Sequence, residues 1–240
     1  MFEKFVGAAI VITLLTCGCG GNSSSGSGSA TLRVLNASAD VESVNVIVGG
    51  QTVATNVEYP MCIYEICQTL SGYATVKSGG ISFALEDSTG KNYVPSQFQK
   101  LSLTNNTQNT FVLSPPTSGN VNDSDAGYLF VDDDTPVANS VQIRIANVDP
   151  RNPTVSVYIL PNGVTPSGNP SISSLAIGAA SSYMTLPPGS YTVWFVGNFG
   201  VLGPQQYLSW GPTTYSANQN YTVYLMQQID SDRAVILADN

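Results

Sequence analysis

The chain repeats one pattern after residue 30, and this duplication limits the fold more than any other feature. Four segments recur in the same order at offsets of 107 to 111 positions. The matching segments are 31–36 with 142–147, 44–48 with 155–159, 108–113 with 219–224, and 123–132 with 230–239. A fixed offset of this kind indicates an internal repeat. We therefore predict two units, residues 31–135 and 139–240, each of ordinary domain size.

Each unit has the pattern of short strands joined by tight turns. Apolar residues occupy every second position in 44–48 and 155–159, which is the period of a strand with one buried face. In 155–159 the odd-numbered residues are expected to face a core, and Ser156 and Tyr158 to face outward. Gly and Pro punctuate the chain with 22 and 14 residues. Sheets with one buried face must pack in pairs, so the sequence predicts an all-β fold with one β-sandwich, and one core, per unit.

The first 18 residues have the features of an export signal. A single cation, Lys4, precedes an apolar run of ten residues at 6–15. A membrane-spanning helix needs about 20 residues, so the run suits a secretory signal better. A short buried helix is the alternative, but a Gly/Ser-rich tract at 20–30 follows almost at once and has nothing to bury. We predict a signal peptide at 1–18 and a flexible tether at 19–30.

The end of this signal resembles the lipobox of bacterial lipoproteins, in which a small residue precedes a cysteine that becomes acylated. Cys19 follows Gly18 and is the preferred attachment site, while Cys17 has Leu14 at the usual aliphatic position and remains the alternative. The resemblance implies a multiply acylated N-terminus, which gives stable anchoring in a membrane. Gly20 after the cysteine implies the outer membrane. We therefore expect a lipid-anchored protein of the bacterial cell envelope, attached to the membrane through its N-terminal lipid.

The composition excludes several classes of function. Histidine is absent, which removes Ser-His-Asp and Cys-His relays and His-ligated zinc. The net charge of −8 makes the chain a poor ligand for phosphate backbones, so no nucleic-acid partner is expected. The G-x-S-x-G, phosphate-loop and dinucleotide motifs are missing as well. The sequence predicts no catalytic residue, no enzyme activity and no cofactor.

Both units resemble members of a bacterial family of exported proteins, the domain of unknown function 4397, present here as two tandem copies. The segments that carry the resemblance are 33–40 and 44–48 in the first unit, and 144–150, 155–159 and 186–193 in the second. The first unit departs from the pattern at 70–76, where the expected proline is missing. The resemblance implies two tandem immunoglobulin-like β-sandwich domains and an exported location, and it implies no activity.

Cys62 and Cys67 are the cysteines that would remain after signal removal. An exported chain enters an oxidising compartment, so a disulfide between them is expected if residues 63–66 turn back on themselves. Two buried free thiols are the alternative.

Five aspartates lie within twelve residues and form a weak calcium candidate. They are Asp123, Asp125, Asp132, Asp133 and Asp134. Carboxylates are the ligands that Ca²⁺ prefers, but no Glu closes the loop at the required distance. A solvated linker between the units explains the acidic run as well, so no metal site is predicted.

Trp194 is a weak candidate for a binding residue. If Tyr191 and Phe195 face the core, alternation along the strand points Trp194 outward, where it could stack on a sugar or a peptide. Packing on a loop or on the first unit is the alternative. We interpret the protein as a non-catalytic binding or structural module for an envelope glycan or protein. The alternative is a hydrolase, such as a glycoside hydrolase, that uses a pair of carboxylates about 5–10 Å apart in a cleft.

Overall fold

The computed structural model describes residues 28–59, 72–118, 123–133, 135–197, 206–227 and 232–239. These ranges contain sixteen strands and one short 3-10 helix, η1 (Ser96–Phe98). The strands of the first unit are β1 (Ser29–Asn36), β2 (Ser43–Val48), β3 (Gln51–Glu58), β4 (Ala74–Lys77), β5 (Gly79–Glu86), β6 (Lys100–Leu103), β7 (Gln108–Ser114) and β8 (Ala126–Asp132). Those of the second are β9 (Val141–Asn147), β10 (Thr154–Pro161), β11 (Ile172–Ala176), β12 (Met184–Leu186), β13 (Gly189–Gly197), β14 (Gln206–Tyr215), β15 (Gln219–Gln227) and β16 (Asp232–Ala238). In the described part of the chain, no helix is long and apolar enough to span a membrane.

The two units have the same strand order. The first has sheets β4-β1-β7-β8 and β3-β2-β5-β6, and the second has β12-β9-β15-β16 and β11-β10-β13-β14. Adding eight to each label of the first unit gives the second. In both, the first strand runs parallel to the seventh, as β1 does to β7 and β9 to β15. The predicted all-β sandwich fold is confirmed; each sandwich pairs four strands with four, where a constant immunoglobulin domain pairs four with three.

The register of β15 corrects one step of the sequence alignment. Arg33 pairs with Thr110 across β1 and β7, and Arg144 pairs with Thr222 across β9 and β15. Thr110 is therefore equivalent to Thr222, 112 positions later, and the predicted match with Tyr221 is wrong by one residue. A shift by one residue would turn every side chain of the strand to the opposite face, so the backbone pairing decides the correct match.

Each unit has a hydrophobic core of its own, as predicted. The core of the second unit contains Val155, Val157 and Ile159, which are 1%, 0% and 8% exposed. Ser156 and Tyr158 lie on the other face of β10 and are half-buried. The predicted orientation of this strand is confirmed.

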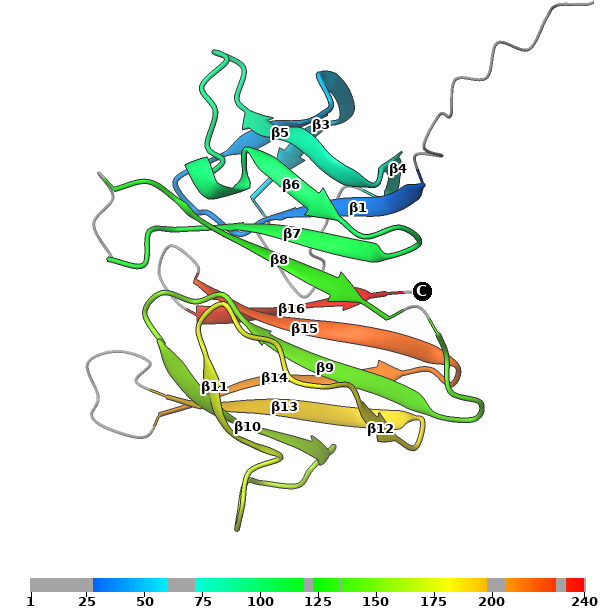
Figure 1. Cartoon of the computed structure of the whole chain (residues 1–240). Helices are drawn as coiled ribbons and strands as arrows, with labels where there is room; N and C mark the ends of the chain where they lie inside the picture. The colour runs from blue at the N-terminus through cyan, green and yellow to red at the C-terminus, as the bar shows by residue number, and fades with distance from the viewer. Residues whose placement is uncertain are drawn as a thin grey trace, which may run out of the picture.

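A third apolar cluster joins the two units. It lies between the sheet β4-β1-β7-β8 of the first unit and the sheet β12-β9-β15-β16 of the second, which face each other in the middle of the molecule (Figure 1). Its buried members are Leu35, Ala37, Tyr59, Val112, Phe130, Ala146, Val148, Tyr224, Met226, Val235 and Leu237. The molecule is thus a stack of four sheets with three apolar layers between them.

Candidate functional site

Charged side chains of the two inner sheets meet at the interface between the units. Arg33 on β1 donates from Nε to Thr110 Oγ1 at 2.8 Å within its own unit. Its other nitrogens cross to the second unit, where Nη1 donates to Ala238 O at 2.6 Å and Nη2 to Asp239 Oδ1 at 2.5 Å. The first unit therefore holds the end of β16 through a single guanidinium.

Arg144 on β9 makes the same contacts in the opposite direction. It donates from Nε to Thr222 Oγ1 at 3.0 Å, from Nη1 to Val131 O at 2.7 Å and from Nη2 to Asp132 Oδ1 at 2.5 Å. Each arginine thus reaches the aspartate of the other unit and the carbonyl just before it. A self-complementary exchange of this kind is the signature of an approximate two-fold axis between the units.

A threonine and a tyrosine complete the coordination of each carboxylate. Asp132 Oδ2 accepts hydrogen bonds from Thr110 Oγ1 at 2.5 Å and Tyr73 OH at 2.8 Å, and the Tyr73 ring lies 4.5 Å from the guanidinium carbon of Arg33. The other half repeats these contacts. Asp239 Oδ2 accepts hydrogen bonds from Thr222 Oγ1 at 2.6 Å and from Tyr183 OH at 2.9 Å. The Tyr183 ring lies 4.7 Å from the guanidinium carbon of Arg144. We call these eight side chains the interface network.

The four charged groups of the interface network are closed to solvent, while Tyr73 and Tyr183 at its edges are half-buried. The side chains of Asp132 and Asp239 are 0% exposed, and those of Arg33 and Arg144 are 5% and 6% exposed. Burial raises the pKa of Asp239, and the hydrogen bond from Thr222 works against that rise. Two cations and two anions balance here, each hydrogen-bonded, which buried charges require. These carboxylates therefore hold the units together and offer no acid–base pair to a substrate.

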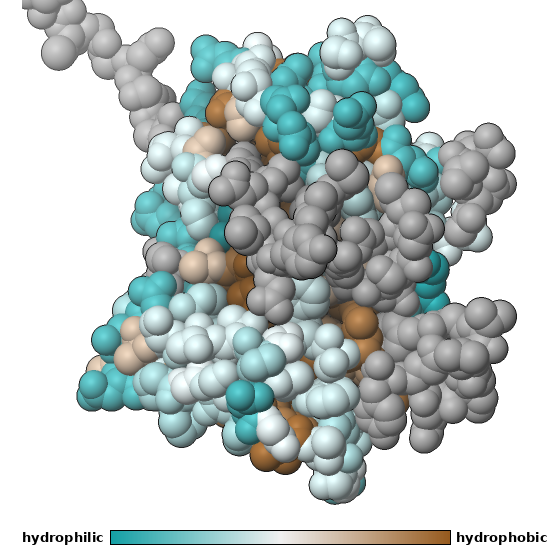
Figure 2. Space-filling model, turned by 180° about the vertical axis from the view of Figure 1, so that it is seen from behind, coloured by the Kyte–Doolittle hydropathy of each residue, from teal (hydrophilic) through white to brown (hydrophobic). Residues whose placement is uncertain are grey.

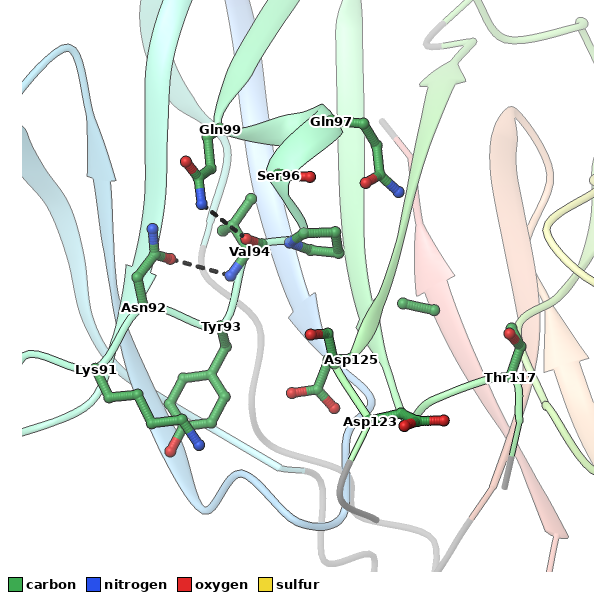
Figure 3. Close-up of a pocket in the computed structure, with 13 residues that line it drawn as sticks. Lys91, Asn92, Tyr93, Val94, Ser96, Gln97, Gln99, Thr117, Asp123 and Asp125 are labelled. Carbon is green, nitrogen blue, oxygen red and sulfur yellow. Dashed lines mark hydrogen bonds between the residues drawn. The ribbon is translucent and has the colours of Figure 1, made fainter. Parts of the chain in front are cut away.

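A polar cavity lies at one end of the first unit. Its volume is about 870 Å³, and it opens between the β5–β6 loop, which includes η1, and the β7–β8 loop. Figure 3 shows the two loops facing each other, with Gln97 on the first and Thr117, Asp123 and Asp125 on the second. Amides, hydroxyls and carboxylates dominate its lining, so the cavity suits a polar ligand.

Hydrogen bonds and a cation–π contact hold two side chains of this cavity, Asp125 and Lys91, in place. Asp125 accepts a hydrogen bond from Ser38 Oγ at 2.8 Å, and burial raises the pKa of its carboxyl group. The ammonium of Lys91 lies 4.3 Å from the ring centre of Tyr93, and Tyr93 OH donates to Asp87 at 2.9 Å. The wall of the cavity is therefore ordered by contacts from three separate segments of the chain.

The predicted calcium candidate is not assembled. Asp123 and Asp125 precede β8 and line the cavity, whereas Asp132 ends β8 and belongs to the interface network. A strand rises about 3.3 Å per residue, which separates Asp125 from Asp132 by roughly 23 Å. Asp133 is exposed beyond the strand, and Asp134 lies outside the described residues. Among the residues that the structure places, no three potential metal ligands lie together.

Trp194 lies on the outer face of its sheet. Tyr191 and Phe195 are in the core of the second unit, and Trp194 pairs with Tyr158 on β10 and Ser209 on β14. Its side chain is half-buried. A second cavity, of about 540 Å³, lies nearby along β14 and β16, but Trp210 rather than Trp194 lines it.

The four cysteines lie outside the described residues. Acylation of Cys19 or Cys17 and a disulfide between Cys62 and Cys67 therefore remain predictions.

Sequence reasoning missed the interface network, although a signal for it was present. Arg33 and Arg144 are each the one charged residue of a strand in which most residues are buried, and they occupy equivalent positions of the repeat. Asp132 and Asp239 recur at equivalent positions as well. A charged residue in a buried strand needs a partner of opposite charge, and the repeated aspartates were the candidates for it.

Comparison with known proteins gives a family and several distant structural matches, among them two from Bacteroides. No curated protein matches the chain. A "putative cell adhesion protein" from Bacteroides uniformis has 9% identity and a TM-score of 0.29, with 89% of this chain and 99% of that one covered. A "putative cell adhesion protein" from Bacteroides fragilis has 13% identity and a TM-score of 0.24, with 82% and 84% covered.

The family assignment rests on the sequence. The pattern described as "Domain of unknown function (DUF4397)" matches residues 30–158, which is more than half of the chain. The matched range spans the strands of the first unit and continues into β10 of the second. The chain therefore belongs to the DUF4397 family.

Proposed function

We propose that the protein is a non-catalytic binding module, anchored by lipid in the bacterial cell envelope, whose two sandwiches act as one rigid body. The observation that carries this proposal is the interface network. It places the paired carboxylates and both of their arginine partners in a solvent-free layer between the units. Charge is used there to fix the two units relative to each other, whereas the carboxylates of Asp123 and Asp125 line a cavity that a ligand can reach and lie on a loop.

The exposed surface supports binding through loops. On the face in Figure 2, the described residues are mostly hydrophilic to neutral, with small and scattered hydrophobic patches. The large cavity lies between two loops at the end of a rigid sandwich. Loops held by a rigid scaffold are where proteins most often place binding residues.

The second unit is, in this proposal, a second copy of the DUF4397 domain. Its strand order supports this, and so does a repeated corner after the first strand. Asn36 Nδ2 donates to Val41 O at 2.8 Å, and Asn147 Nδ2 donates to Asn152 O at 2.8 Å. The same asparagine therefore holds the same bend in both units.

Lipid attachment is tested by replacing the proposed cysteine. Cys19→Ala is expected to move the protein from the membrane fraction to the soluble fraction, because the acyl chains supply the membrane affinity. Mass spectrometry of the wild-type N-terminus should find an acylated Cys19 and no residues 1–18. Cys17→Ala is the matched control and should stay in the membrane fraction. An intact, unmodified N-terminus in the wild type would contradict the anchor.

Binding without catalysis is tested with washed cell envelopes. The chain from residue 28 onward, which carries both units and no acylated cysteine, is expected to sediment with the envelopes in a saturable manner. Reducing ends and free amines in the supernatant should stay constant during the incubation. A release that grows in proportion to the amount of protein would favour the hydrolase alternative. A complete lack of sedimentation would contradict the binding function.

A further inference from the structure

The polar cavity of the first unit has the composition of a sugar site. We propose that it binds an uncharged oligosaccharide; this inference rests on the proposed binding function and names the ligand class of that function. The cavity volume of about 870 Å³ falls within the range of ligand pockets. Its lining is polar, which favours a ligand rich in hydrogen-bonding groups over an apolar one.

Several side chains of the lining have hydrogen-bonding capacity to spare. Ser96, Gln97, Thr117 and Ser124 make no side-chain hydrogen bond to any other residue within the described ranges. An amide offers a donor and an acceptor side by side, and a hydroxyl offers both on one atom. A sugar hydroxyl has the same dual character, so adjacent hydroxyls of one ring match these groups without any net charge.

The charges around the cavity indicate which class of polar ligand it favours. The lining contains two carboxylates, Asp123 and Asp125, and a single cation, Lys91, so an anionic ligand is repelled. The ammonium of Lys91 lies over the Tyr93 ring and makes no ion pair with either carboxylate, so it lowers the pKa of Asp125 only at longer range. The carboxyl of Asp125 is partly withdrawn from water and bonded to Ser38, and burial raises its pKa. It can still accept a hydrogen bond from a sugar hydroxyl.

The loop that forms one wall is preorganised. Asp87 accepts hydrogen bonds from Thr89 N at 2.8 Å and Lys91 N at 3.0 Å, which close the turn before the cavity. Asn92 Oδ1 accepts from Val94 N at 3.0 Å, as Figure 3 shows. A wall that is already ordered loses little entropy when a ligand binds. This matters for sugars, because each of their hydrogen bonds replaces one made with water.

The test uses the chain from residue 28 onward and a printed array of uncharged oligosaccharides from bacterial and animal cell surfaces. At least one group of related glycans should be bound, and the best of them is then measured by titration calorimetry. Gln97→Ala should weaken this binding roughly fivefold, the loss of about one hydrogen bond. Asp125→Asn keeps the bond to Ser38 and should weaken it by no more than that. Gln51→Ala, in an exposed glutamine of β3 outside the cavity, is the control and should bind like the wild type.

Salt separates a sugar from a cationic peptide. Raising NaCl from about 50 to 500 mM should change sugar affinity less than twofold, since screening acts on charged ligands. No bound glycan, a bound glycan unaffected by Gln97→Ala, or tight salt-sensitive binding of hexalysine lost in Asp125→Asn would each overturn the proposal. If envelopes are still bound in those cases, the binding function stands and the ligand class fails. If envelopes are not bound either, the function itself fails.

Discussion

Replacing Asp132 with alanine is expected to lower the free energy of unfolding by about 3–5 kcal/mol. The carboxylate accepts hydrogen bonds from Arg144, Thr110 and Tyr73 and lies 3.8 Å from Arg33. Its removal leaves a buried guanidinium without its main anion, and a charge cannot be returned to water while the units remain packed. Urea denaturation followed by circular dichroism measures the change.

An exposed aspartate of the same unit provides the control. Asp40 lies at the surface, and Asp40→Ala is expected to change stability by no more than about 0.5 kcal/mol. Asp239→Ala should cost about as much as Asp132→Ala, because the two carboxylates hold equivalent positions. If Asp132→Ala proved as mild as Asp40→Ala, the interface network would not be what holds the two sandwiches together.

Val157→Asp is expected to be the other severe substitution. Val157 is 0% exposed in the core of the second unit, and an aspartate there has no cation within the apolar cluster. The carboxyl must either stay protonated, with a raised pKa, or carry its charge into an apolar medium, and both outcomes cost several kcal/mol. Thermal melting should show a large fall in Tm or no cooperative transition.

Its neighbour on the opposite face gives the comparison. Ser156 is half-buried on the outer face of β10 and donates a hydrogen bond to Ser173 O at 2.7 Å. Ser156→Asp removes that bond and should cost about 1 kcal/mol or less. A larger loss for Ser156→Asp than for Val157→Asp would mean that the register of β10 is shifted by one residue.

The alternation along β10 could be predicted because it depends on local sequence. In a strand the side-chain period is fixed at two, so Val155 and Val157 identify the core face without knowledge of their partners. The same reasoning identifies the core residues of β13. The repeat predicted the number of sandwiches, because each copy contains a complete set of strands.

The contacts between the two sandwiches could not be predicted from local sequence. Arg33 meets Asp239, 206 positions away, and nothing local says which unit supplies the partner. The one-residue error in β15 has a similar cause. Gln219 and Asn220 match Gln108 and Asn109 in letters, but the parallel pairing with β9 places each of them one residue earlier than that match requires. The alignment was based on identical residue types, whereas the register of the strand is set by which of its faces packs against the core.

The cavity of the first unit was beyond sequence reasoning for a further reason. Its lining comes from residues 91–97, 99, 117 and 123–126, with Ser38 from a third segment bonded to Asp125. Turn residues in three loops have no periodicity that points to a common site. Only the strands that carry these loops bring them to one end of the sandwich.

The approximate two-fold exchange between Arg33 and Arg144 has a consequence for how stability depends on dilution. In a dimer of separate chains such an interface dissociates at low protein concentration, so stability falls as the sample is diluted. Here residues 133–140 connect the two halves, and the partner is supplied at the effective concentration of an intramolecular reaction, of millimolar order for a short connection. The paired surfaces therefore stay together however scarce the protein is, which a dimer of separate chains cannot achieve.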